Sequence, residues 1–107
     1  MIKNDRSRFH AYNIILAYES SGRQLKSVRN DYFNTNNLSS SERSRSMALS
    51  NEVVRWKRTL DNWIARSLKK PIKKLPLKVL CILRLGYYEY VMDSFVPAHA
   101  AVDSWVE

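Results

Sequence analysis

The sequence predicts an all-α fold of five or six helices, and three observations support this expectation. The 107 residues include only two glycines and three prolines, too few for an all-β fold with many tight turns. Apolar residues recur in several segments at spacings of three and four, the period of an amphipathic helix. The segment 77–92, LKVLCILRLGYYEYVM, is apolar almost all round, which is typical of a central helix with neighbours on several sides. A chain of this length is expected to form a single domain, here residues 1–107.

Capping signals define the first two helices. Asp5 and Ser7 are both candidate N-caps for a first helix, because their side-chain oxygens can accept hydrogen bonds from free backbone N–H groups. Gly22 follows the last turn of this helix and suits the left-handed conformation in which many helices end. A short second helix comes next, and the polar residues 34–37 break it.

A third helix begins at a stronger signal. Ser39 is followed three residues later by Glu42, which is the spacing of a capping box. The helical apolar pattern then continues as far as Leu68. One helix from residue 40 to residue 68 would be long for so small a domain, so we expect a bend or break at residues 59–61.

Prolines separate the remaining helices. Residues 69–76, KKPIKKLP, are expected to form a linker, because its two prolines stop helices. The central helix 77–92 follows, and we expect Leu83 to lie in its core. Pro97 then opens a last helix at residues 98–107.

Positive charge is concentrated in one part of the sequence. The whole chain has 18 Lys and Arg against 10 Asp and Glu, a net charge of +8. Between Arg55 and Lys78, nine basic residues stand against Asp61 alone, and nine minus one again gives +8. Trp56 and Trp63 lie within this basic run, but they fall on the apolar face and are expected in the core.

An excess of positive charge of this size favours a polyanionic partner, which could be RNA, DNA or an anionic membrane. A membrane would require apolar residues that are free to insert, whereas here they are committed to the core. The remaining alternative is a basic surface that contacts only solvent. We expect a nucleic acid, because clustered Lys and Arg neutralise phosphates and release their counterions.

The sequence suggests no enzyme active site, no metal site and no cofactor. His99 and Asp103 are spaced i, i+4, which is typical of an ordinary surface pair. Cys81 lies on the apolar central helix and is expected to be a buried, inert thiol. Two histidines with one cysteine lack metal-ligand spacing, and no glycine-rich loop is present to hold a nucleotide. Because a single cysteine forms no internal disulfide, we expect a reducing, cytoplasmic setting.

Three blocks in the second half of the sequence resemble consecutive blocks of the NusB-like RNA-binding fold. They are VVRWKRTLD (53–61), LRLGYYEYVM (83–92) and VPAHAAVDSWVE (96–107). The V-x-R-W pattern followed by L-D, and P-x-H-A-A-V with V-E, are more similar to one relative than to free-standing NusB. That relative is the N-terminal domain of RsmB-type ribosomal RNA cytosine-C5 methyltransferases. The resemblance extends more weakly back to Arg8.

The resemblance implies an RNA-binding helical domain that performs no chemistry itself. It would recognise ribosomal RNA for an S-adenosylmethionine-dependent methyltransferase; the alternative is a stand-alone transcription antitermination factor acting with a ribosomal protein. In NusB the arginine-rich start of the first helix belongs to the RNA-binding surface. With the basic run added, the candidate RNA-binding residues are Arg6, Arg8, Arg55, Lys57, Arg58, Lys69, Lys70, Lys73 and Lys74.

The resemblance also concerns where the sequence ends. The family fold continues beyond the V-E block with further helices, and a methyltransferase part is absent from these 107 residues. We therefore expect a C-terminally truncated domain whose central helix exposes an apolar patch. Such a patch favours contact with a catalytic methyltransferase domain, with a ribosomal protein, or with a second copy of the chain as a homodimer.

Overall fold

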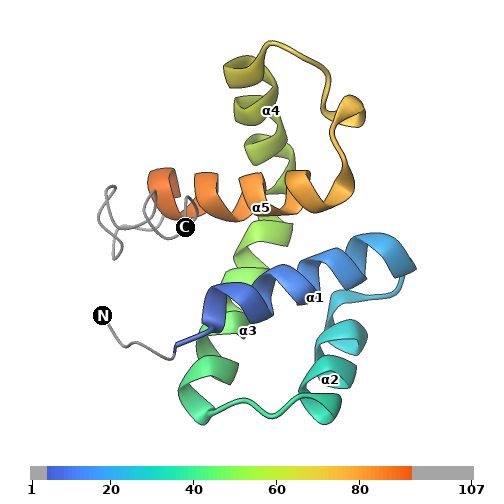
Figure 1. Ribbon diagram of the computed structural model, residues 1–107, viewed down its shortest axis with the longest axis vertical. Coiled ribbons are helices and arrows are strands. Elements are labelled where there is room, and N and C mark those ends of the chain that lie inside the picture. Colours follow the sequence, from blue (N-terminus) through green and yellow to red (C-terminus); the bar gives the residue numbers. More distant parts are fainter. Residues whose placement is uncertain (1–4, 93–107) are drawn as a thin grey trace. The chain divides into compact units, whose positions relative to one another are not determined.

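The computed structural model describes residues 5–92, and all the regular structure in that range is helical (Figure 1). This confirms the predicted all-α fold. The chain divides into two compact units, Met1–Val54 (unit 1) and Arg55–Glu107 (unit 2), and each is described by itself. The predicted last helix at 98–107, with its His99–Asp103 pair, lies outside the described residues.

Unit 1 contains α1 (Ser7–Ser21), α2 (Leu25–Thr35) and α3, which runs from Ser40 to Arg55 at the unit boundary. Helices α1 and α2 pack against each other. The apolar side chains buried in this unit come from all three helices and from the residues that precede α3; they are Ala11, Ile14, Ile15, Val28, Leu38 and Val53.

The end of α1 matches its prediction, and its start differs by one residue. The Asp5 carboxylate accepts hydrogen bonds from the Ser7 backbone N–H at 2.8 Å and from the Ser7 hydroxyl at 2.6 Å. The N-cap position is nevertheless Arg6, which makes no side-chain cap hydrogen bond, and Ser7 is the first helical residue, so neither candidate is the N-cap itself. At the other end Gly22 has a φ of 71°, and its N–H donates to the Tyr18 carbonyl at 3.3 Å.

The capping box of α3 forms as predicted. The Ser39 N–H donates to the Glu42 carboxylate at 3.1 Å, and the Glu42 N–H donates to the Ser39 hydroxyl at 3.1 Å. The predicted break at residues 59–61 is wrong by three residues, because α3 ends at Arg55 and α4 begins at Lys57. Trp56 between them has φ −99° and ψ 14°, outside the helical region, which interrupts the helix without a proline or glycine.

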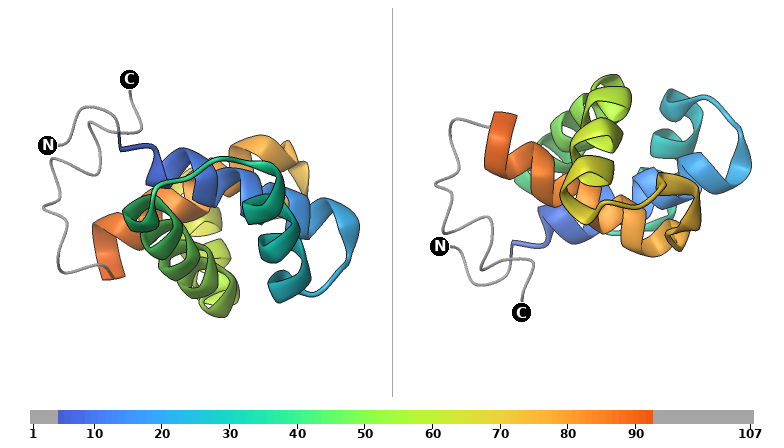
Figure 2. Two further views of the ribbon diagram at one scale, coloured as in Figure 1. Left: turned by 90° about the horizontal axis from the view of Figure 1, so that it is seen from below. Right: turned by 90° about the horizontal axis from the view of Figure 1, so that it is seen from above.

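Unit 2 contains α4 (Lys57–Leu68), the 3₁₀ turn η1 (Ile72–Lys74), α5 (Leu77–Tyr87) and the π-helical turn η2 (Tyr88–Met92). Helix α5 packs across α4, and the turn at residues 69–76 joins them (Figures 1 and 2). The apolar residues buried in this unit are Leu60, Ile64, Leu80, Cys81 and Leu85.

The central helix differs from its prediction in two respects. It was expected to be one helix over residues 77–92, but its last turn, from Tyr88, is π-helical. It was also expected to be covered on several sides with Leu83 in the core. Leu83 is only half-buried, and Val79 and Ile82 are exposed, so α5 buries mainly the face that carries Leu85. Within residues 5–92, no helix has the length and apolar character needed to cross a membrane.

Candidate nucleic-acid interface

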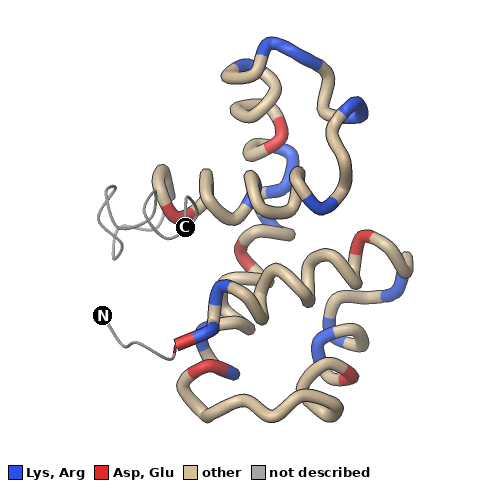
Figure 3. The backbone as a smooth tube through the Cα atoms, in the orientation of Figure 1, with Lys and Arg blue, Asp and Glu red and all other residues tan. Residues whose placement is uncertain are grey.

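Seven of the nine candidate RNA-binding residues lie in unit 2, between the end of α3 and the turn before α5. Figure 3 shows the positively charged positions along the turn that joins α4 to α5. Six of the seven side chains are exposed, and Lys57 is half-buried; the exposed ones are Arg55, Arg58, Lys69, Lys70, Lys73 and Lys74.

Backbone conformation fixes the course of the lysine turn, residues 69–76. Lys69 ends α4 in the left-handed conformation, with φ 54° and ψ 39°. Pro71 then directs the chain into η1, where its carbonyl accepts the Lys74 N–H at 3.1 Å. The Leu75 N–H closes the turn on the Ile72 carbonyl at 2.9 Å. Four lysines are thus held on a short ordered turn that contains no acidic residue.

The single carboxylate within the basic run is neutralised by an arginine outside the run. The Arg84 guanidinium of α5 donates two hydrogen bonds to Asp61 of α4, Nε to Oδ1 at 2.7 Å and a terminal nitrogen to Oδ2 at 2.9 Å. The Arg84 side chain is buried, whereas Asp61 keeps some access to water. Because Asp61 is engaged by Arg84, it offsets little of the charge that the lysine turn presents to a partner.

The aromatic residues of the run lie partly at the surface. Trp56 and Trp63 are each half-buried, so they are not the fully enclosed core residues that the sequence predicted. The Arg55 guanidinium lies 5.5 Å from the centre of the Trp56 ring, within the range of a cation–π contact. This pair places an aromatic ring and a positive charge side by side at the start of the basic run.

An open hollow of about 530 Å³ lies beside the lysine turn. Most of its wall comes from α4, and η1 contributes one apolar side chain. The lining is mixed, since it contains a cation, a carboxylate, an amide, a hydroxyl and two apolar groups; the residues are Arg58, Thr59, Asp61, Asn62, Ala65 and Ile72. Sequence reasoning missed this hollow, because it depends on how the turn folds back on α4.

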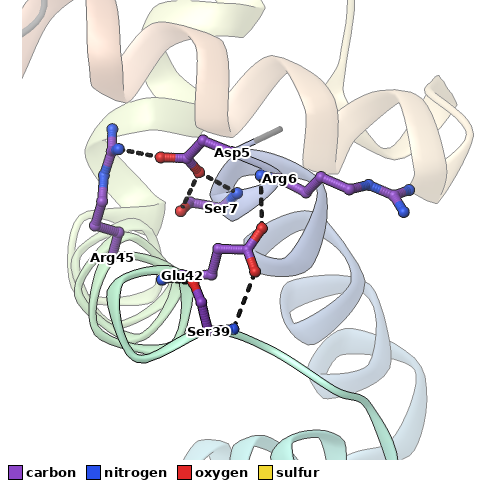
Figure 4. Close-up of polar contacts among 6 residues, drawn as sticks. All are labelled: Asp5, Arg6, Ser7, Ser39, Glu42 and Arg45. Carbon is purple, nitrogen blue, oxygen red and sulfur yellow. Dashed lines mark hydrogen bonds and ion pairs between the residues drawn. The ribbon is translucent and has the colours of Figure 1, made fainter. Parts of the chain in front are cut away.

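The other two candidates, Arg6 and Arg8, lie at the start of α1 in unit 1. Arg6 is exposed, and its guanidinium lies 4.3 Å from the centre of the Phe9 ring. Its backbone N–H donates to the second oxygen of the Glu42 carboxylate at 3.0 Å (Figure 4). The Arg8 charge acts on Asp5, whose carboxylate also pairs with Arg45.

These contacts set the charge states around the start of α1. Burial raises the pKa of Asp5, but the hydrogen bonds from Ser7 and the charges of Arg45 and Arg8 outweigh it, so this pKa is lowered overall. Hydrogen bonds from the Arg6 and Ser39 N–H groups lower the pKa of Glu42. Both carboxylates are therefore ionised at neutral pH.

Sequence reasoning also missed two arginines of α3. Arg45 reaches the start of α1 through its ion pair with Asp5, and Arg43 lies 5.3 Å from the centre of the Phe33 ring. A signal was available, because the capping box fixes the start of α3 and so places both arginines in its first two turns. The contacts of Arg45 with Asp5 and of Arg43 with Phe33 of α2 follow from tertiary packing, which local patterns do not give.

No group of three or more His, Cys, Asp and Glu side chains between residues 5 and 92 is arranged to hold a metal ion. Cys81 is fully buried, as predicted. His10 is also buried, and its Nδ1 lies 2.6 Å from the Tyr32 hydroxyl, which accepts a hydrogen bond from the Asn13 amide at 3.1 Å.

Comparison with known proteins gave one match. The model of the NusB family matches residues 5–107, nearly the whole chain. No curated protein and no solved structure matches the sequence.

Proposed function

Since the chain belongs to the NusB family, we propose that it binds RNA and performs no chemistry of its own. One observation carries this proposal: Arg58 and the lysine turn in unit 2 present exposed positive charge. The single acidic residue of the basic run is held by Arg84, and the four lysines of the turn are exposed.

The basic run would act on the phosphate backbone. Lysine side chains make flexible point contacts with phosphates, and arginine can contact a phosphate with two N–H groups or stack on a base. Arg58 and the lysine turn supply both kinds of contact within one unit. At the start of α1, Arg6 and Arg8 are the candidates that the family resemblance indicates, and we add Arg43 as an exposed arginine of the same unit.

The test is the salt dependence of RNA binding. For single-stranded RNA the logarithm of the binding constant falls with the logarithm of salt concentration, with a slope of about 0.7 per neutralised phosphate. Replacing all four lysines of the turn by glutamine should reduce that slope by about 3 and weaken binding. Fluorescence anisotropy of a labelled single-stranded RNA between low and moderate salt measures both quantities.

Single variants provide the matched control. Lys73→Gln in the turn should reduce the slope by about 0.7, whereas Lys26→Gln should leave it unchanged. Lys26 is an exposed lysine of α2 and is not among the candidates. Circular dichroism checks that each variant is folded. A slope near zero for the wild-type chain would reject RNA binding through phosphates.

We further propose that the RNA is ribosomal RNA and that this domain guides a cytosine-C5 methyltransferase. The support is the similarity of the blocks 53–61 and 83–92 to the RsmB-type N-terminal domain. Residues from these two blocks are in direct contact here, through Asp61 and Arg84. The proposed setting is the cytoplasm, and a catalytic methyltransferase domain is the partner that this proposal requires.

The antitermination alternative makes a different prediction, because such a factor works with a ribosomal protein. Affinity for ribosomal RNA fragments should be high without a protein partner if the methyltransferase proposal is correct. Binding that becomes tight only after a ribosomal protein is added would favour the antitermination factor. Titrating a ribosomal RNA fragment with and without that protein separates the two proposals.

A further inference from the structure

The hollow beside the lysine turn has a volume and a mixed lining that suit a flat, uncharged ring. Its volume of about 530 Å³ falls within the range of small-ligand sites in proteins. Ala65 and Ile72 contribute apolar surface, against which the flat face of a base can pack. Thr59 and Asn62 contribute a hydroxyl and an amide, which can donate to and accept from the edge of a base.

Charged side chains line this hollow and lie beside it. The Asp61 carboxylate also lines it, and its pair with Arg84 leaves this part of the lining without a net charge that would attract a phosphate. Arg58 is exposed and also lines the hollow, and the neighbouring turn carries four exposed lysines. A phosphate is therefore favoured at Arg58 and the lysine turn, and an uncharged base is favoured against Ala65 and Ile72.

We infer that the hollow lined by Arg58, Asn62, Ala65 and Ile72 holds one unpaired base of the RNA, with the flanking phosphates on Arg58 and the lysine turn. This inference rests on the proposed RNA binding and specifies the form of RNA. Bases of an A-form duplex are stacked and paired, so only a single-stranded or extruded nucleotide can enter.

The experiment compares two strands of equal charge. One is a single-stranded RNA of about ten nucleotides with a mixed sequence, and the other has the same sugar–phosphate backbone with all bases removed. The wild-type chain should bind the abasic strand about tenfold more weakly, because one base contact of this kind contributes on the order of a factor of ten. The salt slopes for the two strands should be equal, because both carry the same phosphates.

Ala65→Leu is the variant that tests the hollow itself. It fills the apolar wall without changing charge, and leucine is a good helix former at this position in α4. Its affinity for the base-containing strand should fall to its affinity for the abasic strand. Ala17→Leu is the matched control, because Ala17 is an exposed alanine of α1 in unit 1. This control should retain the tenfold preference.

Three outcomes have distinct meanings. Equal binding of both strands by the wild-type chain, with a steep salt slope, overturns the base site and leaves RNA binding intact. An Ala65→Leu chain that keeps the tenfold preference also overturns the site. Absence of salt-dependent binding to either strand rejects the proposed function, and the inference with it. If Ala65→Leu does not fold, Asn62→Ala replaces it, since Asn62 is exposed, and it should lower the preference several-fold.

Discussion

Replacing Asp61 by alanine is expected to destabilise unit 2 by about 3 kcal/mol. The substitution leaves the Arg84 guanidinium without the two hydrogen bonds of 2.7 and 2.9 Å that its partner accepts. The side chain of Arg84 is only 4% exposed, so water can replace few of those lost contacts. Loss of two hydrogen bonds by a buried charged group is among the more costly changes that a single substitution can make.

The magnitude follows from the exposure of the pair. Removing one member of a fully buried ion pair costs about 3–5 kcal/mol. Asp61 is 23% exposed, so solvent reaches the edge of this site and the cost lies at the lower end of that range. A matched pair exists in unit 1, where Arg23 and Asp31 are 2.6 Å apart but 51% and 61% exposed. Asp31→Ala should therefore cost less than about 1 kcal/mol.

Urea denaturation followed by circular dichroism and tryptophan fluorescence measures both variants. The loss caused by Asp61→Ala should persist in high salt, because a buried pair is screened much less than an exposed one. Adding Arg84→Met to Asp61→Ala should recover part of the stability, since it removes a buried charge that has lost two of its hydrogen bonds. Equal losses for Asp61→Ala and Asp31→Ala would show that burial of the pair does not control its energetic role.

Three further predictions concern stability. Burial lowers the pKa of His10 from 6.5, so the neutral ring contributes its full stability to unit 1 above that pH. The urea midpoint of the wild-type chain should therefore fall from pH 7.5 to pH 5, and the midpoint of His10→Gln should change less over the same range. Leu85→Ala should lower the free energy of unfolding by about 2–5 kcal/mol because Leu85 is fully buried, and Leu83→Ala should lower it by less than half as much because Leu83 is half-buried. Equal losses of stability would contradict the observed burial. Lys69→Gly should raise the free energy of unfolding by about 0.5 kcal/mol, because glycine adopts the left-handed conformation without strain; a decrease would argue against that φ.

Local signals predicted much of the fold correctly. The capping box of Ser39 and Glu42, the left-handed Gly22 and the acceptor role of Asp5 each depend on residues a few positions apart. Such contacts form wherever the right side chains stand at the right spacing, so sequence alone identifies them. The burial of Cys81 follows in the same way from a helix rich in apolar residues.

The features that sequence missed depend on contacts between distant residues or on single backbone angles. Asp61 and Arg84 are 23 residues apart, and nothing in either segment identifies the other as its partner. Trp56 ends α3 through one pair of dihedral angles, without a proline or glycine to signal it. The candidate lysines were found from charge alone, but the hollow beside them requires the turn to be folded. Whether the nine candidate residues contact RNA stays a prediction, and so does dimerisation through the exposed apolar residues of α5.

The carboxylate of Glu42 has a consequence for folding during synthesis. One of its oxygens completes the start of α3, and the other accepts the N–H of Arg6, 36 residues earlier in the chain. The start of α1 therefore gains its full set of hydrogen bonds only after the first turn of α3 has left the ribosome. Until then, α1 must form on the nascent chain with the hydrogen bonds of Asp5 alone. Unit 1 therefore cannot close until residues 39–45, and Val53 of its core, have left the ribosome.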